Sequence, residues 1–319
     1  MQRRHFLAAL PACAPLLTRA QGTPLKIITT DQPGGGMDAL LRPMAEKLAQ
    51  SLGRPVLVEN RPGAQGRIGG GAVVSAAPDG NTLLVTVQGG IVINPQAYPS
   101  WPYDTRTDLV PVTDLGRGSL LLLTPGSAAA ADFKDLARWM KAQPAGSISY
   151  STYSPGTISH FGGVLLAQDL GVDMTAVHYK ASGDQVKDLV GAQVALGWGP
   201  ASGAIAQLVK AGRLKAMAYL GPQRLPAFPN VPTIRELGHP GVEMDGWIGV
   251  FAPKGTPADT VARLQQDIAK VLALPQLREL YLNVGFAPGG MPPAEFAQLV
   301  KSDWLRLGDV MRKIGYKAE

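Results

Sequence analysis

The chain has 319 residues, of which 45% are hydrophobic and 17% charged, and its formal net charge is +6. This composition excludes a disordered chain, and the length is sufficient for one or two domains with a real core. Lys and Arg are scattered without interleaved aromatic residues, which argues against a nucleic-acid-binding protein. A mild positive charge suits an anionic small molecule as partner, and it also suits an ordinary solvated surface.

The N-terminus has the pattern of an export signal over residues 1–22. Basic residues are followed by an apolar stretch and by small residues up to Ala20. The pair Arg3-Arg4 resembles a twin-arginine signal, and the stretch is too short and proline-broken to anchor the chain in a membrane. Cleavage after Ala20 would remove Cys13, the single cysteine, so we expect a soluble exported protein without disulfides.

The chain then alternates between strand-like and helix-like segments. In the first part, strands are expected at 25–30, 55–60, 81–87 and 118–124, and helices at 37–53 and from about 68. In the second part, strands are expected at 147–153, 174–180, 194–199, 214–220 and 246–253, and helices at 132–146, 157–171, 182–193 and 201–212. Two helices, at 256–274 and 293–315, close the chain. This alternation predicts an α/β fold of two lobes with parallel sheets covered on both faces.

Three glycines, Gly34 to Gly36, stand where the first strand hands over to the first helix. The first amides of a helix are unpaired and carry partial positive charge, and glycine lets an anion approach them closely. The loop is therefore a candidate cradle for a phosphate or a carboxylate. A tight turn that uses glycine only for its backbone angles is the structural alternative.

A dinucleotide site is the sharpest enzymatic interpretation of this loop. Gly34, Gly36 and Ala39 satisfy a loose fingerprint, and Glu59 ends the second strand where a ribose-binding acid is expected. Against it, Gly34, the first glycine of the fingerprint, comes four residues after the strand and not at its end, and no Walker motif follows. The prediction from this pattern, an oxidoreductase, would imply a cytoplasmic protein.

A second loop of the same kind lies between the strand at 147–153 and the helix at 157–171, with Thr157 or Ser159 able to cap that helix. Two such loops in matching places of two lobes are typical of a protein that binds a ligand in a cleft. His160 is able to orient a carboxylate, or to serve as a structural hydrogen-bonding residue. Trp198, at a strand end, faces either the cleft or the core. We find no nucleophile elbow and no metal-binding motif, so neither a catalytic residue nor a metal is expected.

With these motifs in hand, the sequence resembles the periplasmic receptors of the tripartite tricarboxylate transporter family, the Bug-type solute-binding proteins. The strongest matches are GGGMD at 34–38, the block ENRPGAQGRIGGGAVVSAAPDGNTLLV at 59–85, YSPGTISH at 153–160, HYKASGDQVKDLVGAQVA at 178–195 and GWIGVFAPKGTP at 246–257. The order and spacing of these blocks carry the resemblance over essentially the whole mature chain.

The resemblance implies a type II periplasmic-binding fold, a Venus-flytrap in which two crossover strands, around 116–124 and 246–252, join the lobes. The first lobe would comprise 23–123 and 247–319, and the second lobe 124–246. It also implies a small carboxylated metabolite held by main-chain amides and waters, delivery to a membrane permease, no cofactor and a monomer. A ligand-binding sensor that docks a membrane signalling protein shares this fold and is the other alternative.

The expected ligand-binding residues fall in three groups. The first loop contributes Gln32, Gly34, Gly35, Gly36, Met37 and Asp38, the second contributes Thr152, Ser154, Gly156, Thr157, Ser159 and His160, and Gln88, Tyr179 and Trp198 would shape the pocket.

The chain departs from the family pattern in three places. Thr30-Asp31-Gln32 replaces an apolar entry to the first loop, Gly199 stands where an acidic residue is often found, and His178 replaces the usual proline. A ligand with an ammonium group is therefore less expected.

Overall fold

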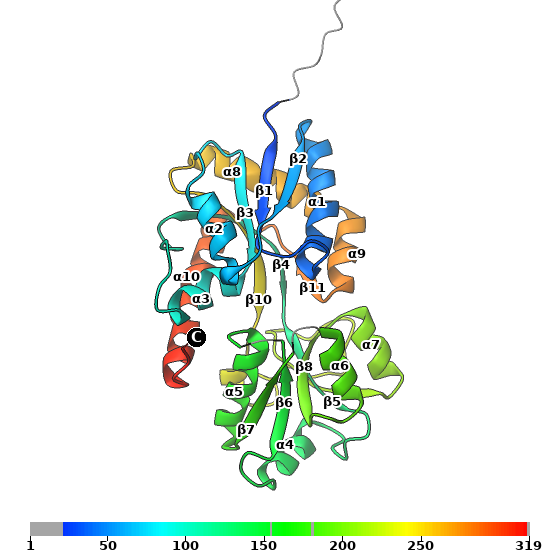
Figure 1. The fold of residues 1–319 in the computed structure, drawn as a ribbon. Coiled ribbons are helices and arrows are strands. Elements are labelled where there is room, and N and C mark those ends of the chain that lie inside the picture. Colours follow the sequence, from blue (N-terminus) through cyan, green and yellow to red (C-terminus); the bar gives the residue numbers. More distant parts are fainter. Residues whose placement is uncertain (1–21, 154, 180–181, 318–319) are drawn as a thin grey trace, which may run out of the picture.

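The computed structural model describes residues 22–153, 155–179 and 182–317. Two sheets with helices packed around them form an upper and a lower lobe, joined by strands that pass between them (Figure 1). The predicted export signal lies outside the described residues except for residue 22. Among the described residues, no helix is both long and apolar enough to cross a membrane.

The first lobe contains a six-stranded sheet with the order β11-β4-β10-β3-β1-β2. Its strands are β1 (Leu25–Thr29), β2 (Val56–Asn60), β3 (Thr82–Val87), β4 (Leu109–Gly118), β10 (Gly246–Pro253) and β11 (Phe286–Pro288). Its helices are α1 (Gly36–Leu52), η1 (Ala64–Gly66), α2 (Arg67–Val74), η2 (Gly89–Ile93), α3 (Asn94–Ala97), α8 (Ala258–Leu272), α9 (Pro275–Asn283) and α10 (Pro293–Lys313).

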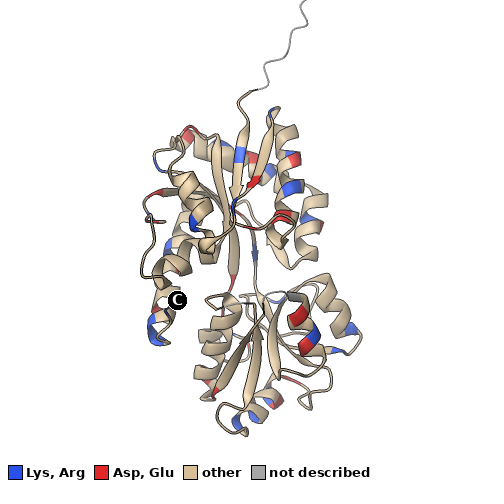
Figure 2. Ribbon diagram, viewed as in Figure 1, with Lys and Arg blue, Asp and Glu red and all other residues tan. Residues whose placement is uncertain are grey.

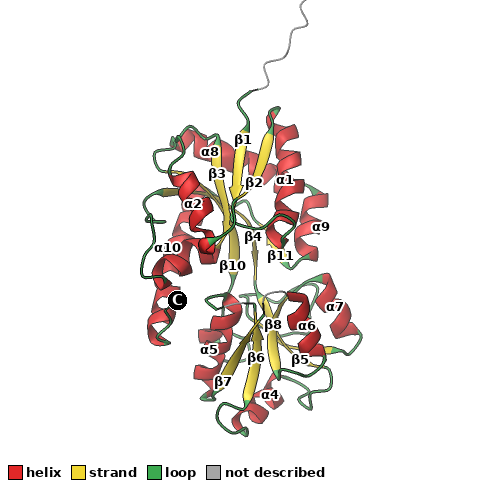
Figure 3. Ribbon diagram, viewed as in Figure 1, coloured by secondary structure: helices red, strands yellow, loops and turns green. Residues whose placement is uncertain are grey.

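The second lobe contains a five-stranded sheet with the order β7-β6-β8-β5-β9. Its strands are β5 (Leu120–Pro125), β6 (Ile148–Thr152), β7 (Met174–His178), β8 (Leu196–Pro200) and β9 (Leu214–Tyr219). Its helices are α4 (Phe133–Lys141), α5 (Ile158–Leu170), α6 (Ser182–Val190), α7 (Gly203–Lys210) and η3 (Pro240–Val242). Helices and strands alternate in both lobes, as Figure 3 shows by colour, and this confirms the two-lobed α/β fold.

The prediction that both sheets are purely parallel is wrong. β10 pairs antiparallel with β3 and β4, and β5 pairs antiparallel with β8 and β9. The reason is the path of the chain between lobes. β10 re-enters the first lobe from the opposite end to β3, and β5 enters the second lobe opposite to β8.

Several elements are missing from the sequence prediction, among them the short helices η1, η2, α3 and η3. β4 escaped it because Pro111, Thr113, Asp114 and Arg117 interrupt its apolar pattern. β11 is only three residues long. Three helices close the chain where two were expected, because Pro275 stands at the first helical position of α9, where proline is tolerated, and does not mark the end of a helix.

The four consecutive leucines of β5 are buried on both faces of the second sheet. Leu120 and Leu122 join the core cluster that contains α4 and α5, whereas Leu121 and Leu123 join the cluster on the other face, with α6 and α7. Successive side chains of a strand point to opposite faces, so both faces of this sheet are buried.

The lobes are joined where two strands run side by side. β4 ends in the first sheet at Gly118, opposite Gly246 of β10, and β5 begins in the second sheet at Leu120. The hydroxyl of Ser119, between them, donates to the carbonyl of Met244. We propose that the chain passes from the first lobe to the second at Ser119, a few residues before the boundary at 123 that the resemblance implies.

Candidate functional site

A cavity of about 420 Å³ lies between the lobes, at the end of the sheets where strands lead into helix starts. The first lobe contributes Gly36 and Met37 from the start of α1, and the second lobe contributes Gly156 and Thr157 from the turn before α5. Ligands of open α/β sheets bind outside the carboxyl ends of the strands. The structure therefore brings parts of both predicted loops to one space.

The first loop is organised by two carboxylates. The Gly34 N–H donates to Asp38 Oδ2 over 2.8 Å, and the Asp38 N–H donates to Asp31 Oδ2 over 3.0 Å. Gly34 has a φ of 76°, which favours glycine. The next two amides, of Gly36 and Met37, lie in the first turn of α1 and have no acceptor among the described residues. These two amides are therefore available to a hydrogen-bond acceptor in the cavity.

Asp38 is a structural residue and does not line the cavity. It is 2% exposed, and it accepts hydrogen bonds from Arg42 Nε and Asn60 Nδ2, both over 2.8 Å. The bond from Arg42 lowers the pKa of this carboxyl to about 2, against the opposing effect of burial. Asp38 is thus ionised and holds the loop, and a direct contact with an anionic ligand is electrostatically unfavourable.

The second loop is held by a chain of hydroxyl groups. Ser159 Oγ lies 2.7 Å from Thr152 Oγ1 and 2.8 Å from Thr157 Oγ1, and it accepts from the Tyr153 N–H over 3.1 Å. Gly156, with a φ of 72°, donates its N–H to His160 Nδ1 over 3.2 Å. Tyr153, Gly156 and Thr157 line the cavity, whereas Thr152, Ser159 and His160 support them from behind.

His160 holds this turn as a neutral imidazole. Burial, and secondarily the charge of His178, lower the pKa of His160 to about 4. The ring of Tyr316, just after α10 of the first lobe, lies 5.7 Å from that of His160 and 5.3 Å from that of Phe161. The C-terminal segment thus contacts the second lobe beside the loop.

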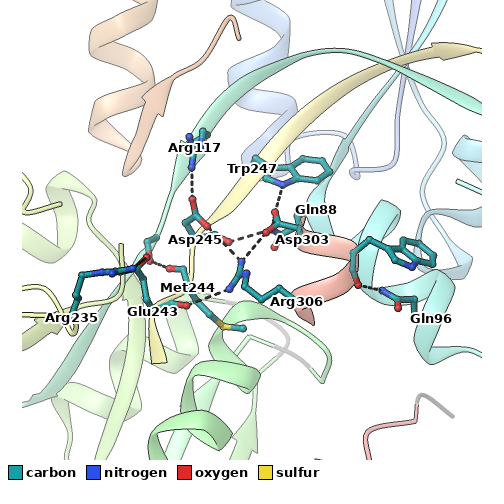
Figure 4. A network of polar contacts seen from close by, with 12 residues as sticks. Gln88, Gln96, Arg117, Arg235, Glu243, Met244, Asp245, Trp247, Asp303 and Arg306 are labelled. Atoms are coloured by element: carbon teal, nitrogen blue, oxygen red, sulfur yellow. Dashed lines mark hydrogen bonds and ion pairs between the residues drawn. The ribbon is translucent and has the colours of Figure 1, made fainter. Parts of the chain in front are cut away.

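The cavity is closed at its base by the strands that join the lobes. Gln88, Ser119 and Trp247 line it there, and Gln88 and Trp247 belong to the polar network drawn in Figure 4. The rest of the wall is largely apolar, with residues such as Leu120, Ile158, Ile248 and Phe286. In the view of Figure 2, the charged residues of the described part of the chain are spread over both lobes. Among the described residues that line the cavity, none is Lys, Arg, Asp, Glu or His.

Several predicted site residues lie elsewhere. Trp198 is 0% exposed and packs in the core of the second lobe, where its indole lies against Gly162 of α5. The Tyr179 hydroxyl donates to Asp188 Oδ2 over 2.9 Å, away from the cavity lining. Gln32 is exposed, and only its backbone takes part in the turn, by accepting from the Gly35 N–H. Ser154 lies outside the described residues.

Sequence reasoning missed other residues of the wall. Val284 and Phe286 come from the α9–β11 segment, and Trp247 comes from β10. Trp247 is only 2% exposed and still borders the cavity. One signal in the sequence could have found the base of the cavity. Gly118, Ser119 and Gly246 stand where the chain crosses between the lobes, and a site between two lobes is bordered by the segments that join them.

A second cavity of about 580 Å³ lies against the joining strands and includes Arg117, Arg224, Asp245 and Glu295. It is larger, but neither of the two glycine-containing loops reaches it. We therefore take the first cavity as the candidate ligand site.

A two-lobed α/β fold with a cavity between lobes, lined by a helix start from each, defines the class of periplasmic solute-binding proteins. The chain belongs to the family described as "Tripartite tricarboxylate transporter family receptor", whose model matches residues 40–316. Protein BugT from Bordetella pertussis is 32% identical, over 98% of this chain and 96% of BugT. This confirms the family resemblance drawn from the motifs.

Solved structures agree with the family. A structure described as a periplasmic transporter is 33% identical with a TM-score of 0.78, covering 93% of this chain and 99% of that chain. MatC from Rhodopseudomonas palustris, solved with bound malate, is 29% identical with a TM-score of 0.74, covering 91% and 99%. An R. palustris protein solved with adipate is 28% identical with a TM-score of 0.78, covering 93% and 99%.

Proposed function

We propose that this chain is an exported, monomeric solute receptor that captures a small organic carboxylate between its lobes and delivers it to a tripartite tricarboxylate-type membrane permease. The observation that carries the proposal is that α1 and α5, from different lobes, both present their N-termini to one cavity. A helix N-terminus favours a negative charge, and two of them facing one space favour an anionic ligand. Relatives of similar fold hold malate and adipate.

The proposed role is binding without catalysis. The described residues of the cavity wall offer backbone amides, hydroxyl groups and one amide side chain, but no acid–base pair. Closure of the lobes would bury the ligand, as in other hinge-bending receptors. The dinucleotide alternative gains no support from Glu59, whose carboxylate pairs with Arg61 at 2.6 Å and Lys26 at 3.6 Å, outside the cavity wall.

The test is a thermal-shift and calorimetric screen of the mature protein against organic acids of two to eight carbons, with NAD as a counter-ligand. A specific acid of micromolar affinity, at 100 times its Kd, should raise stability by about 2.7 kcal/mol through mass action. Binding of NAD without binding of any acid would overturn the proposal.

A further inference from the structure

Gln88 is a buried polar residue at the base of the cavity. It follows β3, its side chain is 3% exposed, and it borders the cavity. Its Nε2 donates to Asp303 Oδ2 over 2.7 Å and to the Asp245 carbonyl over 3.3 Å (Figure 4). Both amide hydrogens are therefore used, and the nitrogen has nothing left to offer a ligand.

Asp303 determines which way this amide points. The carboxylate is 2% exposed and accepts from Trp247 Nε1 at 2.9 Å and from Arg306 Nη2 at 2.9 Å, as well as from Gln88. An ionised carboxylate only accepts hydrogen bonds. A flipped Gln88 amide would bring its oxygen against Asp303 Oδ2, so two acceptors would face each other without a proton between them. The flipped state is thus excluded.

The oxygen of Gln88 is left without a donor. Oε1 is buried and has no hydrogen-bond partner among the described residues. Such an atom costs free energy unless something pairs with it, and bound groups in native sites commonly do so. Nearby, Ser119 donates its single hydroxyl hydrogen to the Met244 carbonyl. Its hydroxyl oxygen can therefore act toward the cavity only as an acceptor. The polar side chains at the base of the cavity therefore require a donor.

We propose that the ligand carries, besides the carboxylate that faces α1 and α5, a hydrogen-bond donor such as a hydroxyl or an amide N–H, which Gln88 Oε1 accepts. Asp303 acts as the positioning residue that keeps this oxygen available. The inference rests on the proposed function and deepens it. It also disfavours a dicarboxylate that spans the cavity, because a second carboxylate would meet only acceptors at the base.

The test is calorimetry of the wild-type protein with matched acids. The aliphatic set is hexanoate, 6-hydroxyhexanoate and adipate, and the aromatic set is benzoate, 4-hydroxybenzoate and 4-methoxybenzoate. The methoxy compound keeps the acceptor oxygen of the phenol and lacks its proton. In at least one set the hydroxy acid should bind about tenfold tighter than its partners, the gain from one well-made hydrogen bond to a buried acceptor.

Two variants connect this preference to the named residues. Asp303→Asn allows the Gln88 amide to flip, and Gln88→Met removes the acceptor at similar size. Both should bring the ratio of affinities for the hydroxy acid and its partner close to one. Gln96→Met is the matched control, because Gln96 also uses both Nε2 hydrogens, which it donates to the carbonyls of Val92 and Trp304, but does not border the cavity. It should keep the wild-type ratio.

The outcomes separate the two proposals. Acids that bind with equal affinity with and without the hydroxyl would overturn the inference and leave the carboxylate receptor standing. Retention of the wild-type ratio in a folded Gln88→Met protein would also overturn it. If none of these acids binds and the broader screen of organic acids finds none either, the carboxylate receptor fails and the inference with it.

Discussion

At the scale of single residues, His160 shows how a group near the cavity acts without touching the ligand. Its Nδ1 accepts from the Gly156 N–H, which requires the neutral tautomer with the proton on Nε2. Burial holds the pKa of His160 at about 4, below its ordinary value of 6.5. The sequence placed His160 in the loop, but its role behind the turn depends on burial that a sequence does not display.

The pKa of His160 predicts a pH dependence of stability. Between pH 6.5 and 4 the unfolded chain binds a proton that the folded protein does not. The stability that the neutral His160 provides is therefore fully present above pH 6.5 and is lost as the pH falls toward 4. Urea unfolding at pH 7 and pH 4.5 measures it. His160→Asn, which retains an acceptor near Nδ1, should lose less stability over this interval than wild type, and equal losses would contradict the assignment.

A second prediction concerns Asp38, which accepts from Gly34, Arg42 and Asn60. Asp38→Ala leaves three donors without their acceptor, and we expect it to lower the free energy of unfolding by about 3 kcal/mol. The control is Asp135→Ala, which removes an exposed pair with Arg138 and should cost less than about 1 kcal/mol. Similar costs for the two variants, measured by urea unfolding, would show that Asp38 does not hold the loop.

At the scale of elements, the start of α1 contains three glycines with different roles. A Cβ on Gly35 would lie 2.4 Å from Asp31 Oδ2, and Gly34 needs its positive φ, so both are structural. Gly36 has no atom within 4 Å of where its Cβ would lie, and it borders the cavity. The fold does not require glycine at this position. The absence of a side chain is best explained by the close approach of a ligand to the backbone.

Gly36→Ala is therefore predicted to leave stability within about 0.5 kcal/mol of wild type, or slightly higher, because alanine favours helix. It should weaken carboxylate binding about tenfold or more, since the methyl group blocks access to the amides. Gly241→Ala, equally free of neighbouring atoms and not among the residues of the cavity wall, is the control and should bind normally. Unchanged affinity in Gly36→Ala would argue that the glycine serves the turn alone.

The elements differ in how much of them the sequence could predict. α1 was predictable from its apolar period and the Gly53 stop, and the two glycine-containing loops from their places between strand and helix. The side of β8 from which Trp198 projects was not, because GWGP has no alternation to set the phase. The pairing of Gln88 with Asp303 joins residues 215 positions apart, and no local pattern reveals it.

At the scale of the whole molecule, the lobes touch beyond the joining strands. Tyr316 follows α10 of the first lobe, and its ring packs against those of His160 and Phe161 of α5. A Cβ on Gly156 would lie 2.5 Å from its hydroxyl, so the two segments are closely fitted. A contact that forms only when the lobes are close stabilises the closed arrangement. A ligand that contacts both loops binds this arrangement, so its apparent affinity rises with the closed population.

Tyr316→Ala should therefore shift the free protein toward an open arrangement. We expect a larger radius of gyration by small-angle scattering and an affinity for the identified ligand that is weaker by about three- to tenfold, with little change in unfolding free energy. Leu305→Ala, which alters a side chain on α10 that is 60% exposed, is the control. An unchanged radius and affinity would indicate that this contact does not govern closure.

The central claim is that one anion is held by the first amides of α1 and α5 together. A crystal structure of the protein with the carboxylate identified by the screen tests it most directly. We predict ligand carboxylate oxygens within hydrogen-bond distance, directly or through one water, of the Gly36 or Met37 amide and of the turn at 156–158. A carboxylate bound away from either helix start, or in the cavity beside Arg117 and Arg224, would contradict it.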